Sequence, residues 1–292
     1  MRFGQGLLCL GLAAAALTGA GCGSNADDNR SAAGQAAVDP GPVHVHGLGV
    51  NPRDGALFVA SHTGLFRAAR DEQRLRRVGD RFQDTMGFTV VGPDRFLGSG
   101  HPDLRDDLPA FLGLIRSGDA GRSWNSVSLA GKADFHVLEA EGKRIYGFGS
   151  DWETRDEQLL ASRDGGRRWQ QRAVPESLIG LAIRPGQART ILASGQRGLH
   201  LSQDTGTSWR TIDGSAGLPA WPSPAALYVM GLDGALRVSA DAGRSWRELA
   251  AAGGQPAAFE AAGPAELYAA MHDATIKYST DGGGTWRVRA RP

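Results

Sequence analysis

Cysteine is nearly absent from this sequence. The 292 residues include two cysteines, Cys9 and Cys22, and none follows Cys22. The body of the chain can therefore form neither a disulfide nor a metal site with cysteine ligands. A domain without these cross-links has to be stabilised by the packing of its core.

Excess charge of one sign is missing too. The chain carries 32 Lys and Arg residues against 31 Asp and Glu residues, a formal net charge of +1. We therefore expect no nucleic-acid partner, because proteins that bind nucleic acid usually present a basic excess. Beyond residue 22 no apolar run is long enough to span a bilayer, so we expect no transmembrane helix.

The composition instead favours a protein of many short strands. There are 42 Gly and 7 Trp residues but only 4 Tyr, and 41% of the residues are hydrophobic. This apolar share is enough for a sizeable core and excludes a wholly disordered chain. Abundant glycine with regularly spaced tryptophan indicates strands joined by tight turns rather than long helices.

The first segment has the pattern of an export signal. Arg2 supplies a positive start, residues 7–17 form a short apolar stretch, and small residues at 19–21 precede Cys22. This pattern resembles the lipobox of bacterial lipoproteins, with Gly19 where leucine is usual. The resemblance implies that residues 1–21 are a signal peptide and that Cys22 carries lipid. The alternative is an ordinary signal peptide cut nearby, with Cys22 incidental.

The same segment predicts where the protein acts. Residues 22–42 have almost no bulky apolar side chains and are expected to form a flexible tether. With lipid on Cys22 the protein is expected to be exported and anchored to the cell membrane or the outer membrane, facing the periplasm or the exterior. The lipid is the only membrane contact that we expect.

The rest of the chain is repetitive. Five segments share the pattern Ser-x-Asp-x-Gly-x-x-Trp, and they begin at Ser117, Ser162, Ser202, Ser239 and Ser279. Their spacing of about 40 residues is typical of one four-stranded blade of a β-propeller. In each segment the Asp can accept backbone N–H groups of a hairpin turn, the Gly can supply a positive φ, and the Trp can bury a large apolar surface.

These segments resemble the Asp-box, or BNR, repeats of the sialidase-like propellers, and the resemblance covers the chain from about His44 to its end. Arg168 stands where Ser or Thr is usual, which should not break the turn. A second-strand pattern occurs six times, at residues 56–60, 95–98, 144–147, 190–193, 226–229 and 266–269. We therefore predict an all-β, six-bladed β-propeller over residues 43–292. Its first blade lacks a box, because residues 68–77 stand in its place.

Histidines collect on one face of the predicted propeller. In a blade, the loop between strands 2 and 3 and the start of strand 1 lie on the same face, which usually binds ligands. The residues that map to this face or to the channel are His44, His46, His62, Met86, His101, His136 and His272. His44 and His46 are both expected on the first inner strand, pointing to the same side. His200, on a third strand, does not belong to this set.

Two roles for these histidines remain open. Imidazoles that converge from neighbouring blades can bind Zn²⁺ or copper, and Met86 or Met271 would favour copper(I). Alternatively, the histidines hydrogen-bond to backbone carbonyls and close a polar channel.

The resemblance also raises a glycoside hydrolase as an alternative. Candidate acid or base groups are Asp103, Asp151 and Glu153, and a ligand face can be built from Arg105, Trp152, Arg155 and Arg197. A true sialidase is not expected, since Ile183-Arg184-Pro185 lies too late in the chain for the family's arginine signature. The sequence therefore predicts a monomeric, exported binding propeller whose ligand is a metal, a small molecule, a glycan or a protein partner. A hydrolase of the same superfamily is the alternative.

Overall fold

The computed structural model describes residues 39–292. The predicted signal peptide (1–21), the predicted lipidation site at Cys22 and most of the predicted tether lie outside the described residues. Residues 39–292 contain no helix, and so none in this part of the chain is long and apolar enough to cross a membrane.

The described residues form six four-stranded antiparallel sheets, each made from four consecutive strands. The strands of blades 1 to 3 are β1 (Val45–Val50), β2 (Leu57–Ser61), β3 (Gly64–Ala68), β4 (Arg76–Arg77), β5 (Asp84–Gly92), β6 (Arg95–His101), β7 (Leu114–Ser117), β8 (Asn125–Ser128), β9 (Ala133–Glu141), β10 (Arg144–Asp151), β11 (Glu157–Ser162) and β12 (Gln170–Arg172). Those of blades 4 to 6 are β13 (Leu178–Ile183), β14 (Ile191–Gly195), β15 (Gly198–Ser202), β16 (Arg210–Asp213), β17 (Leu218–Ser223), β18 (Ala226–Met230), β19 (Leu236–Ser239), β20 (Arg247–Glu248), β21 (Pro256–Ala261), β22 (Leu267–Met271), β23 (Ile276–Ser279) and β24 (Arg287–Ala290).

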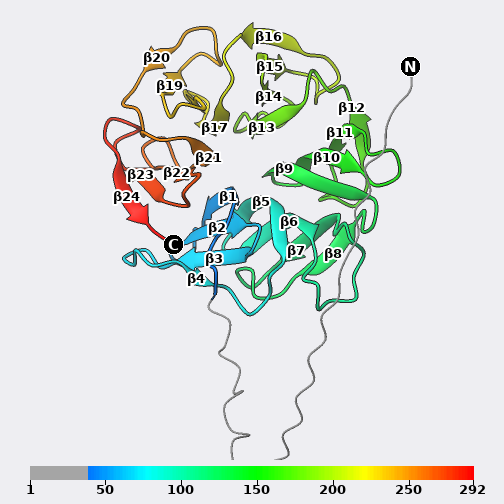
Figure 1. Cartoon of the computed structure of the whole chain (residues 1–292). Coiled ribbons are helices and arrows are strands. Elements are labelled where there is room, and N and C mark those ends of the chain that lie inside the picture. The colour runs from blue at the N-terminus through cyan, green and yellow to red at the C-terminus, as the bar shows by residue number, and fades with distance from the viewer. Residues whose placement is uncertain (1–38) are drawn as a thin grey trace, which may run out of the picture. The chain divides into compact units, whose positions relative to one another are not determined.

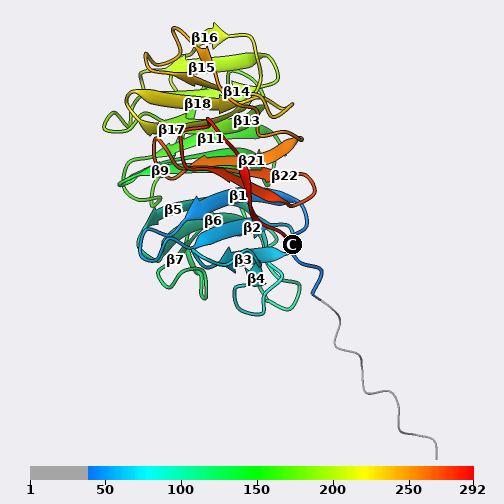
Figure 2. The same cartoon turned by 90° about the vertical axis from the view of Figure 1, so that its left-hand side faces the viewer.

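The six sheets are arranged as blades around a central axis (Figure 1), and the inner strands line the channel along it. The first strand of each blade is innermost, and each inner strand contacts the inner strands of the two neighbouring blades. Viewed from the side, the strands run between the two faces of the ring (Figure 2). The prediction of an all-β, six-bladed propeller is confirmed.

The two faces differ in their turns. We call the face with the turns between the second and third strands, and with the entries into each inner strand, the loop face. The opposite face carries the turns between the third and fourth strands, where the five repeats lie, and we call it the Asp-box face. Because the chain alternates in direction within every blade, side chains at the starts of the inner strands and at the ends of the second strands meet on the loop face.

Each repeat forms the expected hydrogen-bonded turn. In the third box, Gly206 N donates to Ser202 Oγ at 2.8 Å, and Ser208 N donates to Asp204 Oδ1 at 2.9 Å. Arg168 keeps this arrangement, since its backbone N donates to Asp164 Oδ1 at 3.0 Å.

The tryptophans of the boxes join neighbouring blades. Trp209 Nε1 in blade 4 donates to Ala173 O at the end of blade 3, at 2.8 Å, and Trp286 Nε1 in blade 6 donates to Ala250 O at the end of blade 5, at 3.0 Å. The six clusters of buried apolar side chains likewise lie between adjacent blades rather than inside one blade. Burial of this apolar surface stabilises the ring.

The ring closes between blades 6 and 1. After β24, Arg291 pairs with Arg74, and Arg291 N donates to Gln73 O at 3.1 Å. The Arg289 side chain is buried and donates to the backbone oxygens of Ala69 and Glu72. The segment that replaces an Asp box in blade 1 is therefore the segment to which the C-terminal strand attaches.

Candidate metal centre on the loop face

Two groups of histidine and aspartate side chains lie on the loop face of blades 1 to 3. The first, which we call the Asp84 group, consists of His46, His62 and Asp84. His62 Nδ1 lies 2.8 Å from Asp84 Oδ2, and His46 Nε2 lies 3.4 Å from Asp84 Oδ1. One ligand atom from each residue can be chosen so that all three lie within 4.8 Å of one another, which is the spacing expected around a single metal ion.

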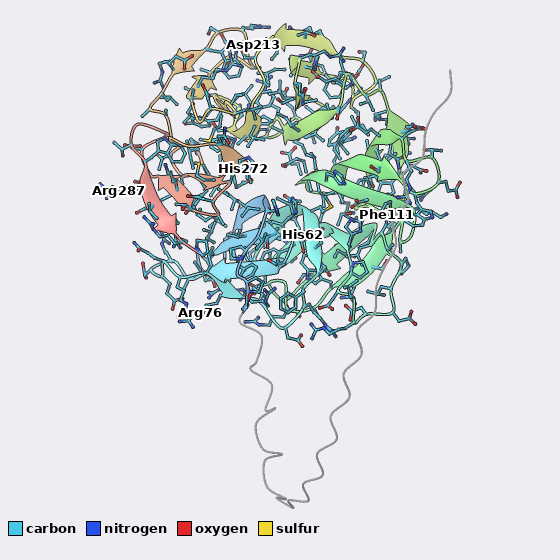
Figure 3. All side chains as sticks on the ribbon, viewed as in Figure 1. His62, Arg76, Phe111, Asp213, His272 and Arg287 are labelled. Carbon is cyan, nitrogen blue, oxygen red and sulfur yellow. The ribbon has the colours of Figure 1, made fainter. Side chains whose placement is uncertain are left out.

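The fold explains why these three residues meet. His46 is at the start of β1, His62 is in the turn between β2 and β3, and Asp84 is the first residue of β5 on the next blade. Figure 3 shows His62 close to the channel. Asp84 is 9% exposed, and its Oδ1 and the Nε2 of His46 are buried without a hydrogen-bond partner. These two atoms lie 3.4 Å apart without a hydrogen bond of good geometry, so both can turn to a ligand that they share.

The second group, which we call the Asp134 group, consists of His101, Asp134 and His136. Asp134 Oδ2 lies 3.3 Å from His101 Nε2 and 3.0 Å from His136 Nε2. His101 Nδ1 also lies 2.9 Å from Ala110 O, a carbonyl that can only accept. Both ring nitrogens of His101 therefore carry a proton.

The pKa values of this group agree with an ion pair. The hydrogen bond to Asp134 raises the pKa of His101 to about 9, despite its partial burial. Although burial opposes the change, hydrogen bonds from His101 and His136 lower the pKa of Asp134 to about 2. Asp84 is the cross-strand neighbour of His101, so the two groups adjoin each other on blade 2.

The structure brings together four of the predicted histidines and separates the others. His46 and His62 meet at Asp84, while His101 and His136 meet at Asp134. The prediction that His44 lies in the inner strand is wrong, because β1 begins at Val45 and His44 has a φ of 50°. Alternation along a strand therefore does not orient it, although its ring lies edge-on to that of His62 at 6.3 Å between centroids.

Two further histidines lie apart from both groups. His272 is exposed in the turn between β22 and β23, on blade 6 (Figure 3). His200 is buried on β15, and its Nε2 lies 2.6 Å from Glu176 Oε1.

Both aspartates were missed in the sequence. A signal existed, since Asp84 and Asp134 each stand two residues before a predicted ligand on the same inner strand, Met86 and His136 respectively.

The predicted arginines have separate local partners. Arg105 bonds to Asp103, and Arg197 N donates to Glu176 Oε2 at 2.9 Å. Arg155 lies over the rings of Trp152 and Phe111.

Trp152 itself packs on Phe111, with the ring centroids 4.9 Å apart, and so joins the two long loops of blades 2 and 3.

The predicted acid and base candidates serve as loop supports. Asp103 is buried and accepts hydrogen bonds from Phe82 N and from Arg105, and the Arg105 guanidinium keeps the pKa of Asp103 well below its usual range. Asp151 accepts from the backbone N of Thr154 and of Glu153, and the bond from Thr154 lowers its pKa. A general acid needs a raised pKa, so neither carboxylate suits that role. Glu153 is exposed.

Two other carboxyl groups do have raised pKa values. Glu139 on β9 and Glu260 on β21 line the same channel cavity, on blades 3 and 6. Partial burial raises the pKa of Glu260 to about 7, and burial together with the neighbouring Glu260 carboxyl raises the pKa of Glu139. The pair therefore retains a proton near neutral pH.

This pair predicts a loss of stability at higher pH. The pKa of Glu260 is higher in the folded protein than in the unfolded chain. The contribution of its protonated form to stability is therefore complete below about pH 4.5 and is lost as the pH rises through about 7. We expect Glu260→Gln to stabilise the protein at pH 8 by about 1–2 kcal/mol, because it removes a charge that the cavity disfavours. The effect is no larger because both glutamate side chains are partly accessible to solvent. Thermal unfolding of both proteins from pH 5 to 8 tests this, and parallel pH profiles would contradict it.

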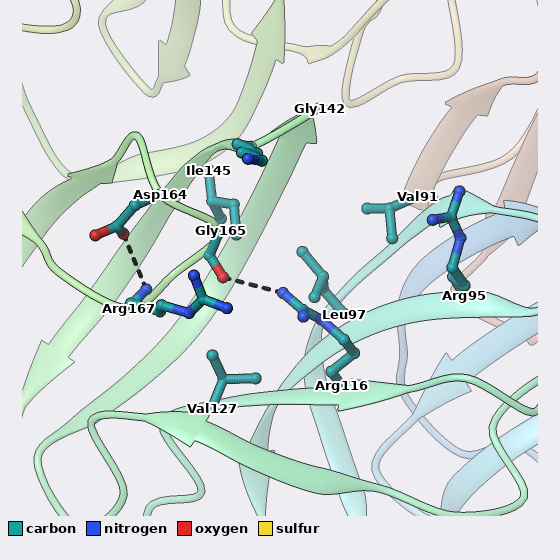
Figure 4. Close-up of a pocket in the computed structure, with 11 residues that line it drawn as sticks. Val91, Arg95, Leu97, Arg116, Val127, Gly142, Ile145, Asp164, Gly165 and Arg167 are labelled. Carbon is teal, nitrogen blue, oxygen red and sulfur yellow. Dashed lines mark hydrogen bonds between the residues drawn. The ribbon is translucent and has the colours of Figure 1, made fainter.

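A larger cleft lies away from the histidines. It has a volume of about 460 Å³ and lies between blades 2 and 3 near an Asp-box turn (Figure 4). Arg95, Arg116, Lys143 and Arg167 line it with a single carboxylate, Asp164, and Arg116 donates to Gly165 O at 3.0 Å. Its cationic lining suits anions rather than metal cations.

Comparison with known proteins gives the same architecture. The model of the BNR/Asp-box repeat matches residues 277–288, which contain the whole fifth box. No curated protein matches the sequence. Among solved structures, a YCF48 protein bound to a D1 peptide is 15% identical, with 85% of this chain and 83% of that chain covered and a TM-score of 0.53.

Two glycoside hydrolases are also similar. The GH74 enzyme of Niastella koreensis is 13% identical, with a TM-score of 0.60 and coverage of 86% of this chain and 46% of that chain. The GH74 xyloglucanase of Xanthomonas campestris is 18% identical, with a TM-score of 0.53 and coverage of 85% and 45%. The chain spans about half the length of these two enzymes. At such identities the likeness shows the fold alone.

Proposed function

The chain is a six-bladed propeller with BNR/Asp-box repeats, and on this premise we propose that it is an exported binding protein that holds a transition-metal ion on its loop face. The ligands are His46, His62 and Asp84. One observation carries the proposal: the three side chains offer ligand atoms within 4.8 Å of one another. The buried Nε2 of His46 and Oδ1 of Asp84 also make no hydrogen bond.

The chemistry of the Asp84 group fits a divalent ion. Two imidazoles and one carboxylate suit Zn²⁺ and Cu²⁺, and they leave further coordination positions for water or another ligand. His62 and Asp84 share a proton in their hydrogen bond, and a metal ion bound by both would take the place of that proton. Metal binding by these residues therefore depends on their deprotonation.

The site of action follows from the first segment. We propose that Cys22 carries lipid and that the propeller acts outside the cytoplasm, at the cell membrane or the outer membrane. The signal-like residues 1–21 support this proposal. A protein or glycan on the loops of blades 2 and 3 is compatible with the same role, since Trp152 is 40% exposed there.

Metal titration tests the proposal directly. We expect the purified protein to bind about one equivalent of Zn²⁺ in calorimetry and to unfold at a higher temperature when Zn²⁺ is present. Asp84→Asn and His62→Ala should each weaken binding at least on the order of tenfold, because each removes a ligand atom. His272→Ala is the matched control, since His272 is an exposed histidine outside the Asp84 group and should leave the affinity unchanged.

Two results would contradict the proposal. One is a metal-free protein that takes up no Zn²⁺ or Cu²⁺ and gains no thermal stability from either ion. The other is turnover of an aryl glycoside that Glu260→Gln abolishes, which would favour the hydrolase alternative instead.

A further inference from the structure

Five of the six inner strands share an irregularity near their starts, and β17 is the exception. The pairing of β1 with β2 skips His46, and that of β9 with β10 skips His136. The pairing of β5 with β6 skips Met86 together with Gly87. The same irregularity skips Ile179 in β13 and Ala257 in β21. A bulge of this kind turns its extra side chain away from the regular pleat.

These five side chains line one cavity. It has a volume of about 90 Å³ and lies in the channel. Blades 1 to 3 contribute two imidazoles and a thioether to it, from His46, Met86 and His136, whereas blades 4 and 6 contribute the apolar Ile179 and Ala257. Three of the five bulged residues therefore offer nitrogen or sulfur ligand atoms, and the other two are apolar. The carboxyl groups of Glu139 and Glu260 line the same cavity.

The two histidines are prepared to act as ligands. His46 Nε2 is buried and makes no hydrogen bond, and it lies 3.4 Å from Asp84 Oδ1. His136 Nε2 lies 3.0 Å from Asp134 Oδ2 and donates its proton there, which leaves the lone pair of Nδ1 for a metal. A carboxylate that holds the far nitrogen of an imidazole is the usual support of a metal-binding histidine.

We propose that His46, Met86 and His136 hold a copper(I) ion at the loop-face end of the channel. This inference rests on the proposed function and names the metal that the loop face selects. A thioether is a ligand for copper(I) rather than for Zn²⁺, and a trigonal set of two nitrogens and one sulfur satisfies that ion.

The Asp84 group and the copper(I) site share His46 and differ in their other ligands. The carboxylate of Asp84 favours a divalent ion, and the sulfur of Met86 favours copper(I). A comparison of the two metals on one set of variants therefore separates this inference from the proposed function.

The experiment is an anaerobic competition for copper(I) against a coloured chelator, with a Zn²⁺ titration of the same proteins. We expect Met86→Leu, which keeps the side-chain volume, to lower the ratio of the copper(I) affinity to the Zn²⁺ affinity at least tenfold. Met271→Leu is the control, because Met271 is buried in the core between blades 5 and 6. X-ray absorption of the copper(I) protein should show a sulfur neighbour that Met86→Leu removes.

The outcomes are distinct. If Zn²⁺ binds but Met86→Leu changes neither the affinity ratio nor the absorption spectrum, the copper(I) site is overturned and the proposed function stands. If Met271→Leu lowers the ratio as much as Met86→Leu, loss of packing explains the result and the inference fails. If the wild-type protein binds neither metal, the proposed function itself has failed.

Discussion

Gly149→Ala is expected to destabilise the propeller by about 3 kcal/mol or more. A Cβ atom at residue 149 would lie 1.7 Å from the carbonyl oxygen of Asp134 and 2.8 Å from Phe135 Cα. Both are backbone atoms of β9, so the clash cannot be relieved by rotating a side chain. The bulge that carries His136 lies opposite Gly149. We expect the added methyl group to displace this bulge and, with it, the Asp134 group.

Urea unfolding measures this effect, with Gly118→Ala as the control. A Cβ atom at Gly118 meets nothing within 4 Å, and the fourth box already has alanine, Ala240, at the equivalent position. The control should therefore change stability by less than about 0.5 kcal/mol. Equal stability of the Gly149 and Gly118 variants would refute the close approach of β9 to β10.

Arg289→Met should destabilise the protein by about 2–4 kcal/mol by weakening the closure of the ring. The Arg289 side chain is 7% exposed, and it donates to the carbonyls of Ala69 and Glu72 across the junction of blades 6 and 1. Methionine fills a similar volume but cannot donate to either oxygen. We expect the outer segment of blade 1 to lose protection against amide hydrogen exchange first.

The matched control is Arg287→Met on the same strand. Arg287 is exposed at the rim of the ring (Figure 3), so its removal should leave the free energy of unfolding nearly unchanged. If both variants unfold at the same urea concentration as the wild type, the closure does not depend on the Arg289 side chain.

The repeats made the fold predictable from the sequence. A box such as Ser202 to Trp209 forms its turn from hydrogen bonds between near neighbours, and a glycine with positive φ completes it. Five copies at nearly constant spacing therefore determine the blade count and the place of each turn.

The candidate site was only partly predictable. Four predicted histidines do meet, yet the aspartates that join them were missed, since Asp84 and His62 are brought together by the packing of two blades. Met86 was predicted as a ligand, but the bulge that turns it into the channel comes from the pairing of β5 with β6. The arginines were expected to form one surface, and each has a local partner instead.

The sequence by itself determined the all-β architecture, the number of blades and the face on which the histidines lie, because turns and strand alternation depend on residues close together in the chain. Only the tertiary structure decided which histidine meets which aspartate, where the ring closes and which side chains line the channel. These contacts join residues on different blades, and their distances depend on bulges and on glycines such as Gly149 that let two backbones approach.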